Sequence, residues 1–262
     1  MMRVEFLTEE DSLYILPFFE EFLAHYRHEF NIVQISCAPI MGSRPKTRLA
    51  RELMWLYGVR GLTRLLVRHA YSKMLSRIPR GPNATRYHSV EQACRAYGIP
   101  YEKIRNPNSE AFARKAMERR ADVIVSVACP YILKKHLLGL PRLGCVNIHH
   151  ALLPRYRGMM PTFWQLYHGE KEVGLTIHQM AETLDAGKAL FQGTLKVLGG
   201  ETLDHLIRRS KRHAANELTN VLHRLARNEC ETFDLSREGG SYFTFPTRQQ
   251  IGEFHARGLK AI

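Results

Sequence analysis

The sequence predicts an α/β protein built on a mostly parallel β-sheet with helices on its faces. Strand-like and helix-like segments alternate along most of the 262 residues, which is the pattern of βαβ units. One strand-like segment, Asp122–Val127, is largely β-branched, as in a strand that is buried on both faces. The composition, 45% hydrophobic and 24% charged, is that of an ordinary globular protein long enough to bury a sizeable core.

The N-terminal part predicts two strands joined by a helix, followed by a long basic helix. Apolar residues recur at helical spacing in the first helix, and the second strand is expected to be buried. The turn after the first strand is acidic and has no glycine. The expected strands are Arg3–Thr8 and Asn31–Cys37, and the expected helices are Ser12–His28 and Arg48–Ile78.

The long basic helix carries most of the excess charge of the chain. Residues 44–80 hold ten Lys or Arg against one acid, a balance of +9 within a net charge of +13. Arg60, Arg64 and Arg68 are four residues apart, so we expect them to share one helical face. Gly58 and Gly61 can divide the segment into two helices. The apolar residues expected on another face are Leu62, Leu65, Leu66, Ala70 and Met74.

Helix caps and further apolar runs define the remaining elements. Ser89 with Gln92 fits a capping box, Gly98 fits the end of that helix, and Ser109 fits the start of the next. The expected helices are Ser89–Tyr97, Ser109–Arg119, Tyr131–Leu138, Thr162–His168 and Leu203–Arg227. The expected strands are Pro100–Ile104, Asp122–Val127, Cys145–Ile148, Val173–His178 and Ala189–Leu195.

Cysteine usage and charge restrict the compartment and the partners. Five scattered cysteines without CxxC spacing argue against a disulfide framework and for a reducing, cytoplasmic location. We expect neither a secretory signal nor a membrane-spanning segment, because the apolar runs are short. The net positive charge favours anionic partners, which include phosphorylated metabolites, nucleic acid and an anionic membrane surface.

Three polar side chains form a candidate catalytic set. Asn147 and His149 are two residues apart at the end of a buried strand, so their side chains point to the same side. Asp185 follows 38 residues after Asn147, in a polar turn. In acyl transfer to an amine, an amide and a protonated imidazole can stabilise the developing oxyanion, and a carboxylate can support the imidazole and accept a proton. A lone Asn and His would otherwise be interpreted as a turn cap and a core histidine.

The residues around this set closely resemble the folate-dependent formyltransferase family. The resemblance covers about residues 88–200, and Asp122–Leu133 with Gly144 look like the strand and folate-binding loop of the family. It implies a Rossmann-like sheet, 10-formyltetrahydrofolate as formyl donor, and Asn147, His149 and Asp185 as catalytic residues. The family usually has Pro-Ser after the catalytic histidine, where this chain has His150-Ala151. The motifs are Asn147-x-His149, Leu152-Leu153-Pro154, Arg157-Gly158, Pro161, Trp164, Gly169-Glu170, Gly174-x-Thr176-x-His178 and Leu184-Asp185-Ala186-Gly187.

The resemblance also implies the walls of the binding pocket. Arg155, Arg157 and Met160 are expected on the acceptor side, where an arginine fork can clamp a phosphate or otherwise remain a solvated surface charge. No metal is expected, because the adjacent histidines His149 and His150 point to opposite sides of a strand. The residues expected to hold the folate donor are Tyr131, Ile132, Leu133, Ala181, Glu182, Leu184 and Gly187.

The acceptor is expected to be a primary amine on a small anionic molecule. An amino sugar linked to a nucleotide or another phosphate carrier fits best, because the acidic turn at 8–12 disfavours a ribonucleotide phosphate and the C-terminal extension is too short for a tRNA-enzyme barrel. Glycinamide ribonucleotide, an aminoacyl acceptor and a non-catalytic basic module that binds nucleic acid remain the alternatives. No specific nucleic acid is expected as a partner.

The domain organisation is expected to be a catalytic domain at 1–200, interrupted by a basic helical insertion at about 44–80. A C-terminal helix and short extension occupy 201–262. The insertion has three interpretations, which are a surface or homodimer contact, recognition of an anionic acceptor, and peripheral membrane contact through residues 48–78.

Overall fold

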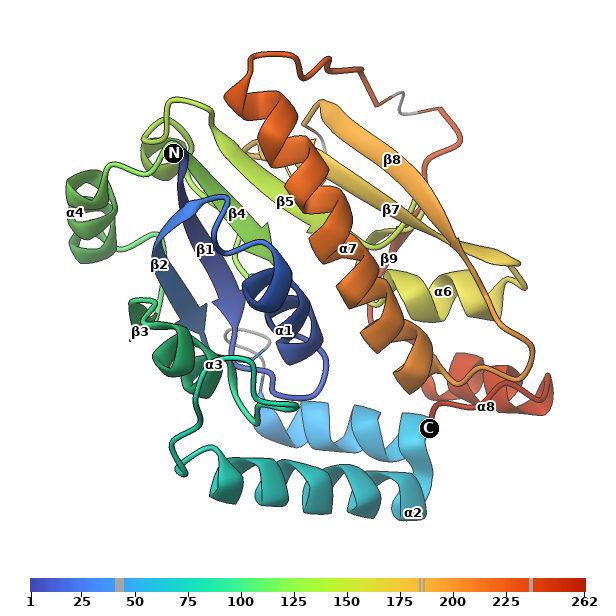
Figure 1. Cartoon of the computed structure of the whole chain (residues 1–262). Coiled ribbons are helices and arrows are strands. Elements are labelled where there is room, and N and C mark those ends of the chain that lie inside the picture. Colours follow the sequence, from blue (N-terminus) through green and yellow to red (C-terminus); the bar gives the residue numbers. More distant parts are fainter. Residues whose placement is uncertain (41–44, 184, 186, 236–237) are drawn as a thin grey trace.

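The computed structural model describes residues 1–40, 45–183, 185, 187–235 and 238–262. Its main feature is a seven-stranded sheet in the order β3-β2-β1-β4-β5-β7-β8 (Figure 1). The first five of these strands pair in parallel, whereas β7 pairs antiparallel with both β5 and β8. The expected α/β class with a mostly parallel sheet is therefore confirmed.

The strands and helices are bounded as follows. The strands of the main sheet are β1 (Arg3–Glu9), β2 (Asn31–Ala38), β3 (Tyr101–Lys103), β4 (Val123–Val127), β5 (Cys145–His149), β7 (Glu172–Gln179) and β8 (Ala189–Lys196). The short strands β6 (Arg157–Gly158) and β9 (Tyr242–Phe243) pair with each other. The helices are α1 (Leu16–His25), α2 (Lys46–Leu75), α3 (Val90–Tyr97), α4 (Glu110–Arg119), α5 (Lys135–Leu138), α6 (Pro161–Tyr167), α7 (Leu203–Ala226) and α8 (Arg248–Ala256).

Helices cover both faces of the sheet, and the pattern of strand β1 shows why. Successive residues of a strand point to opposite faces, and in β1 both directions are buried. Phe6 packs with the aromatic side chains of α1 and with the inner face of α7. Its neighbour Leu7 packs on the other face with Phe112 of α4 and Leu137 of α5. The carboxyl ends of the parallel strands are thereby left as the open edge at which ligands bind in such sheets.

Most helix boundaries follow the capping signals of the sequence. The Ser89 hydroxyl accepts a hydrogen bond from the Gln92 backbone N–H at 3.0 Å, and Gly98 ends α3 in the left-handed conformation. The Gln92 side chain accepts from the His88 N–H rather than from Ser89, so only half of the expected capping box forms. Ser109 caps α4 in the same way.

Two of the expected helices differ in extent from the prediction, and one helix of the structure was not expected. Helix α1 begins at Leu16 rather than Ser12, because the Asp11 carboxylate accepts hydrogen bonds from the N–H groups of Leu13 and Tyr14 and holds that stretch in a turn. The helix expected at Tyr131–Leu138 is confined to α5, four residues long, and the segment before it forms a loop. Helix α8 has a capping box at Thr247 and Gln250 and lies in the C-terminal extension, where no further helix was expected.

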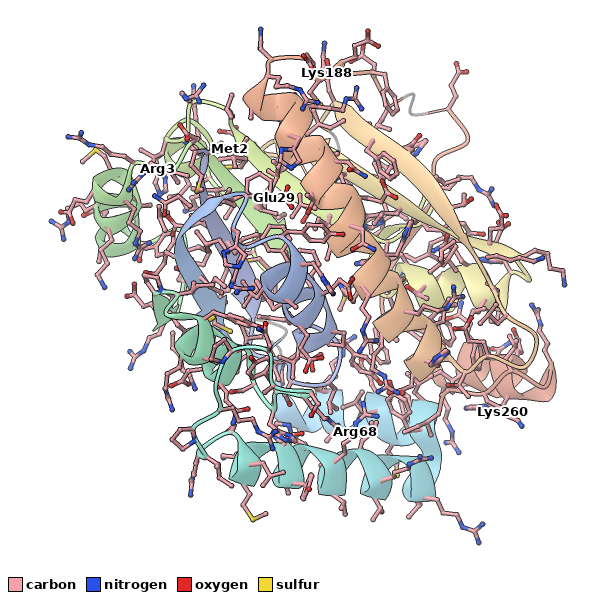
Figure 2. All side chains as sticks on the ribbon, viewed as in Figure 1. Met2, Arg3, Glu29, Arg68, Lys188 and Lys260 are labelled. Carbon is pink, nitrogen blue, oxygen red and sulfur yellow. The ribbon has the colours of Figure 1, made fainter. Side chains whose placement is uncertain are left out.

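Helix α2 is divided at Gly58, whose φ of 64° and ψ of 177° interrupt the helical path. Figure 1 shows its two halves running in opposite directions, with the second half at the outer edge of the molecule. The expected apolar face does not lie against the core as a whole. Leu65 is buried, but Leu66 and Met74 are exposed. Arg68 does not share its surroundings with Arg60 and Arg64, because it turns inward to pair with a carboxylate of α7 (Figure 2).

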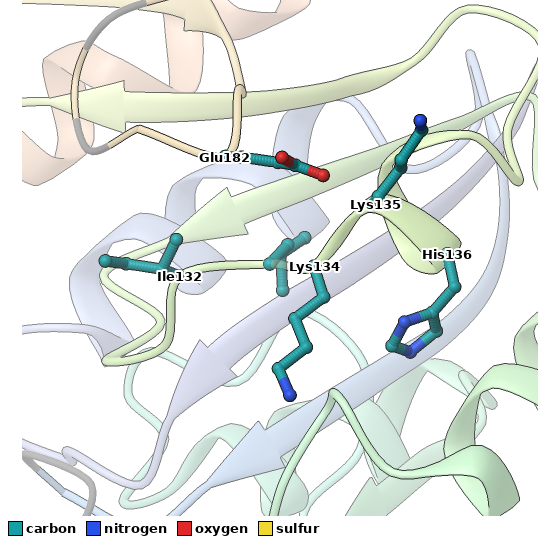
Figure 3. Close-up of a pocket in the computed structure, with 6 residues that line it drawn as sticks. Ile132, Lys134, Lys135, His136 and Glu182 are labelled. Carbon is teal, nitrogen blue, oxygen red and sulfur yellow. The ribbon is translucent and has the colours of Figure 1, made fainter.

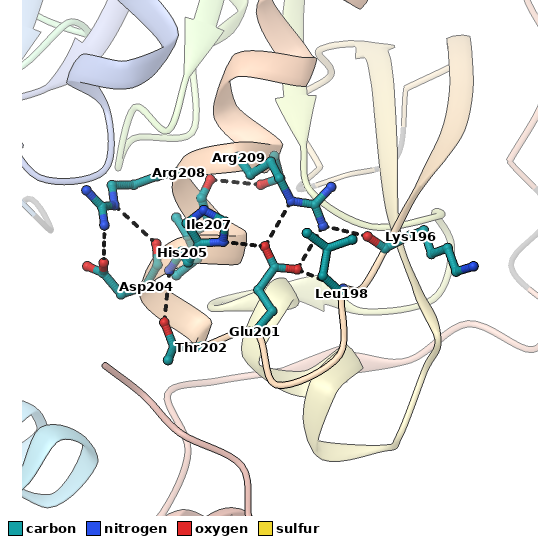
Figure 4. A network of polar contacts seen from close by, with 10 residues as sticks. Lys196, Leu198, Glu201, Thr202, Asp204, His205, Ile207, Arg208 and Arg209 are labelled. Atoms are coloured by element: carbon teal, nitrogen blue, oxygen red, sulfur yellow. Dashed lines mark hydrogen bonds and ion pairs between the residues drawn. The ribbon is translucent and has the colours of Figure 1, made fainter.

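Helix α7 is anchored at its N-terminal end by a polar network (Figure 4). Thr202 caps the helix by accepting a hydrogen bond from the His205 N–H at 3.3 Å. The nearly inaccessible Glu201 carboxylate pairs with Arg209 at 2.8 Å, and the buried Asp204 carboxylate pairs with Arg68 of α2 at 3.0 Å. Helix α7 shares its core with α1 and the sheet; the domain division expected at residue 200 stays a prediction. None of the described helices is long and apolar enough to cross a membrane.

Candidate active site

Strand β5 presents Asn147 and His149 at the carboxyl edge of the sheet. The strand lies between β4 and β7, so its backbone is hydrogen-bonded on both sides. The side chain between them, Ile148, enters the hydrophobic core on the opposite face. The position of both polar side chains is therefore fixed by a central strand rather than by a loop, which is what a precise catalytic geometry requires.

Asp185 meets these two residues from the loop between β7 and β8. It adopts a positive φ of 50°, a conformation that aspartate tolerates better than most side chains. Its Oδ1 lies 3.8 Å from His149 Nδ1 and 3.6 Å from His178 Nε2. Its Oδ2 accepts a hydrogen bond from the Gly158 N–H at 3.2 Å. The structure thus brings together all three residues of the expected catalytic set, with His149 and Asp185 both buried.

The hydrogen bonds of the two histidines fix which ring nitrogens carry protons. His149 Nε2 lies 2.8 Å from the Tyr156 carbonyl oxygen, and because a carbonyl only accepts, Nε2 is the protonated nitrogen. The Nδ1 that faces Asp185 then carries the lone pair of the neutral ring.

His178 is a contact that the catalytic set did not include. Its Nδ1 donates to the Gln179 carbonyl at 2.8 Å, so its Nε2 accepts from the Asn147 amide nitrogen at 3.2 Å. Burial lowers the pKa of His178, although the Gln179 carbonyl and Asp185 oppose that shift. A neutral His178 therefore orients the Asn147 amide at neutral pH, and its place in the motif around Gly174 was the available sequence signal.

A cleft of about 530 Å³ lies over this cluster. Its volume is in the range of small-molecule sites. Asn147, His149, His178 and Asp185 line it together with residues of the loops around 128–132 and 180–183. Its lining also includes residues 158–161, Tyr242, Glu9 and Lys211.

The residues expected to hold the folate donor divide between this cleft and an adjoining hollow. Tyr131, Ile132 and Ala181 line the cleft. Ile132 also lines a shallow hollow of about 740 Å³ together with Leu133 and Glu182 (Figure 3). Gly187 lines neither and instead approaches the backbone of β7, while Leu184 lies outside the described residues. The basic side chains at the hollow are Lys134, Lys135 and His136.

The expected acceptor-side residues are only partly at the cleft. Met160 lines it, but neither arginine does. The Arg155 guanidinium pairs with Glu170 and contacts the Tyr156 hydroxyl, so its charge is already used on the surface. Arg157 lies on β6 with a buried Nε that has no partner within the described part of the chain. Arg155 as a phosphate clamp is therefore not supported by the geometry.

Three further polar side chains line the cleft, although none of them was among the expected catalytic or binding residues. Glu9 ends β1, His150 follows the catalytic strand, and Lys211 comes from the middle of α7. His150 Nδ1 lies 3.3 Å from the Ser210 hydroxyl, and its buried Nε2 has no hydrogen-bond partner among the described residues. Burial lowers the pKa of Lys211 to about 8, with Glu9 and Asp11 opposing the shift. Lys211 and His150 line the same cleft only because α7 packs on the sheet beside strand β5.

No cluster of three or more metal-binding side chains is arranged around a common point in the described ranges of the chain. The lining of the cleft includes an amide, two imidazoles and a carboxylate, which are group types that can transfer protons and stabilise an oxyanion.

An amide, an imidazole and a carboxylate at the carboxyl edge of an open α/β sheet have the chemistry that a group-transfer enzyme needs. Residues 80–222, more than half of the chain, match the formyl transferase family. The protein belongs to that family, and its sheet is the Rossmann-like fold of folate-dependent N-formyltransferases.

Individual relatives and solved structures agree with this assignment. A methionyl-tRNA formyltransferase of Kosmotoga olearia is 38% identical over 108 residues, 41% of this chain and 35% of that protein. The bifunctional polymyxin resistance protein ArnA of Wigglesworthia glossinidia brevipalpis is 30% identical over 157 residues, 60% of this chain and 24% of that protein. The chain thus spans about a quarter to a third of these two curated relatives.

Two solved structures share the fold over nearly the whole chain. A glycinamide ribonucleotide transformylase of Symbiobacterium toebii has a TM-score of 0.60 at 17% identity and covers 90% of this chain and 95% of its own. A sugar N-formyltransferase of a Shewanella species has a TM-score of 0.56 at 19% identity and covers 98% of this chain and 88% of its own. At such identities the likeness concerns the fold alone.

Proposed function

We propose that the protein transfers a formyl group from 10-formyltetrahydrofolate to a primary amine of a small anionic acceptor. The observation that carries this proposal is that Asn147, His149 and Asp185 all line one cleft of small-molecule size, with His149 and Asp185 in contact. Membership of the formyl transferase family supports the donor. The donor supplies the formyl carbon and leaves as tetrahydrofolate.

The residues of the cleft divide the work of the reaction. The acceptor nitrogen forms a bond to the formyl carbon and loses a proton, while the bond from that carbon to the folate nitrogen breaks and that nitrogen gains a proton. The Asn147 amide donates to the formyl oxygen as it becomes negative, and so does the Nδ1–H of a protonated His149, because the Nε2–H of that ring is held by the Tyr156 carbonyl. Asp185 stabilises the His149 cation and accepts the proton of the amine directly or through water.

The acceptor we propose is an amino sugar on a nucleotide or another phosphate carrier. Lys211 places a buried cation in the lining of the cleft, and the Glu9 carboxylate lies in the same lining. The similar folds include sugar N-formyltransferases and glycinamide ribonucleotide enzymes, so the acceptor needs a direct test.

That test is a screen of amine acceptors with 10-formyltetrahydrofolate, followed by mass spectrometry for the gain of one formyl group. Amino-sugar nucleotides are expected to be formylated, and glycinamide ribonucleotide and methionyl-tRNA are the competing acceptors in the same screen. Release of tetrahydrofolate without formylation of any acceptor would indicate hydrolysis, and absence of donor binding would contradict the proposed activity.

The charge of Lys211 predicts a pH dependence of acceptor binding. With a pKa of about 8, the Lys211 side chain is mostly charged at pH 7 and loses its charge as the pH rises through 8. If this cation holds the acceptor anion, the acceptor dissociation constant is expected to increase above pH 8 by up to tenfold per pH unit, while the donor constant stays level. Isothermal titration at pH 6.5 to 9.5 measures both.

Two variants isolate this contribution. Lys211→Arg keeps a charge that does not titrate in this range and is expected to remove the limb near pH 8. Lys211→Met is expected to weaken acceptor binding at pH 7 and to flatten the profile. The exposed Lys171→Met is the matched control and should behave as wild type. An unchanged limb in Lys211→Met would assign the pH dependence to another group.

The adjoining hollow predicts where the anionic tail of the donor lies. Lys134 and Lys135 are exposed at its rim, next to Ile132 and Glu182 (Figure 3). Lys134→Gln/Lys135→Gln is expected to raise the KM of a polyglutamylated donor by about tenfold at low salt, because two rim cations are lost. Steady-state kinetics with donors of different tail length checks this. An equal rise for a donor without glutamates would contradict it.

A further inference from the structure

The second half of α2 and the turn that follows it carry a group of apolar side chains that are each more than half exposed, although the Tyr71 ring meets the edge of the His88 ring. These side chains recur along the helix so that they gather on the outward side, and each of them is between 51% and 70% exposed. Isolated exposed apolar residues are normal, but a contiguous group on one helix marks an interaction surface. We call the following residues the α2 outer face: Val59, Leu66, Val67, Tyr71, Met74 and Ile78.

The same helix has a separate inner side that is already packed. Gly61, Leu65 and Ser72 are buried there. The side is fixed by the ion pair of Arg68 with Asp204 and by close contact of Gly61 with the side chain of Ile262. The helix that carries the α2 outer face is therefore already packed on its opposite side, so these exposed side chains are not the ones that attach it to the core.

The charge around the α2 outer face has a single sign. Residues 53–90 contain no Asp or Glu and seven arginines or lysines. Of these, Arg60, Arg64, Lys73 and Arg77 are exposed, and none of the four pairs with a carboxylate in the ranges that the structure describes. The surface therefore interleaves apolar tips with unneutralised cations.

We propose that the α2 outer face docks on an anionic phospholipid surface. Apolar side chains enter the boundary between headgroups and acyl chains, and flanking lysines and arginines bind the anionic headgroups. Two other occupants fit less well. A second copy would place two strongly cationic faces against each other, and nucleic acid would use the cations but leave the apolar tips without a partner. The proposal is independent of the reaction proposed above.

The position of this surface relates docking to the cleft. Strands β1 and β2 point their carboxyl ends toward α2 (Figure 1). The Tyr57 hydroxyl in the first half of α2 is hydrogen-bonded at 2.8 Å to that of Tyr14, which follows β1. The α2 outer face thus belongs to the end of the molecule at which the cleft lies, and docking brings the cleft close to the lipid surface.

Vesicle cosedimentation tests the proposal with the whole protein. We expect binding to vesicles of phosphatidylcholine with phosphatidylglycerol, weaker binding as salt rises, and little binding to phosphatidylcholine alone. Leu66→Gln/Met74→Gln is expected to lower the partition coefficient by about tenfold or more, because two apolar side chains are lost. Arg60→Gln/Arg64→Gln/Lys73→Gln is expected to lower it by about a hundredfold.

Matched controls carry the same chemical changes on other surfaces. Met117→Gln/Leu198→Gln and Arg114→Gln/Lys171→Gln/Lys196→Gln replace exposed residues outside α2 and should bind as wild type. Absence of wild-type binding to anionic vesicles overturns the proposal, and so does equal loss in the control variants. Two further outcomes, each in the absence of vesicle binding, also overturn the proposal. Self-association that Leu66→Gln/Met74→Gln abolishes would indicate that a second copy covers this face. Binding of duplex DNA that the same pair of changes leaves intact would indicate nucleic acid.

Discussion

Asn147→Ala, His149→Ala and Asp185→Ala are each expected to reduce formyl transfer by about a hundredfold or more without unfolding the protein. Removal of one oxyanion donor from a water-excluded site typically has this effect on kcat. The loss should appear in kcat rather than in the KM of either substrate, because these groups act on charge that develops during the transfer. Steady-state kinetics and thermal melting of each variant provide the measurement.

The structure adds two sharper comparisons to this prediction. Asp185 contacts both histidines, so the effects of His149→Ala and Asp185→Ala should be less than multiplicative when they are combined. His178→Gln removes the acceptor of the Asn147 amide hydrogen bond but leaves that amide in place, so we expect a smaller loss of kcat than in Asn147→Ala. Near-wild-type turnover of His149→Ala would refute the proposed mechanism.

The strands and the base of the site could be predicted because both depend on local signals. Strand β4 is a short β-branched run, and strand β5 carries Asn147 and His149 at a spacing that places both on one side. The loop before α5 was misassigned because its apolar residues serve the cleft and the core rather than a helical stripe. In α2 the spacing of the apolar residues does not indicate which of them pack against the rest of the protein. Leu66 and Met74 stay exposed in the described chain.

The acceptor side of the site could not be predicted because it is assembled from distant segments. Lys211 reaches the cleft only because α7 crosses the sheet beside His150, which is 61 residues earlier in the chain. Arg155 had the chemistry of a phosphate clamp, but Glu170 neutralises it on the surface. Residue type and spacing specify what a side chain can do, whereas packing decides which charges remain available.

Gly187→Ala is expected to reduce turnover by about a hundredfold, although Gly187 takes no part in the chemistry. A Cβ at this position would lie 1.8 Å from the Gln179 carbonyl oxygen, which belongs to the backbone of β7 and cannot move aside. The loop must shift instead, and it carries Asp185 two residues earlier. A displacement of about 1 Å at a reacting group can cost a factor of a hundred, so the loss should fall on kcat.

A glycine without such a neighbour provides the control. Gly252 lies in α8, and a Cβ added there would meet no atom within 4 Å, so Gly252→Ala should leave kinetics unchanged and raise the free energy of unfolding by up to about 1 kcal/mol. Thermal melting separates a shifted loop from a general loss of fold, because Gly187→Ala should remain folded at the assay temperature. Wild-type turnover in Gly187→Ala would contradict the tight approach of this loop to β7 and its role in placing Asp185.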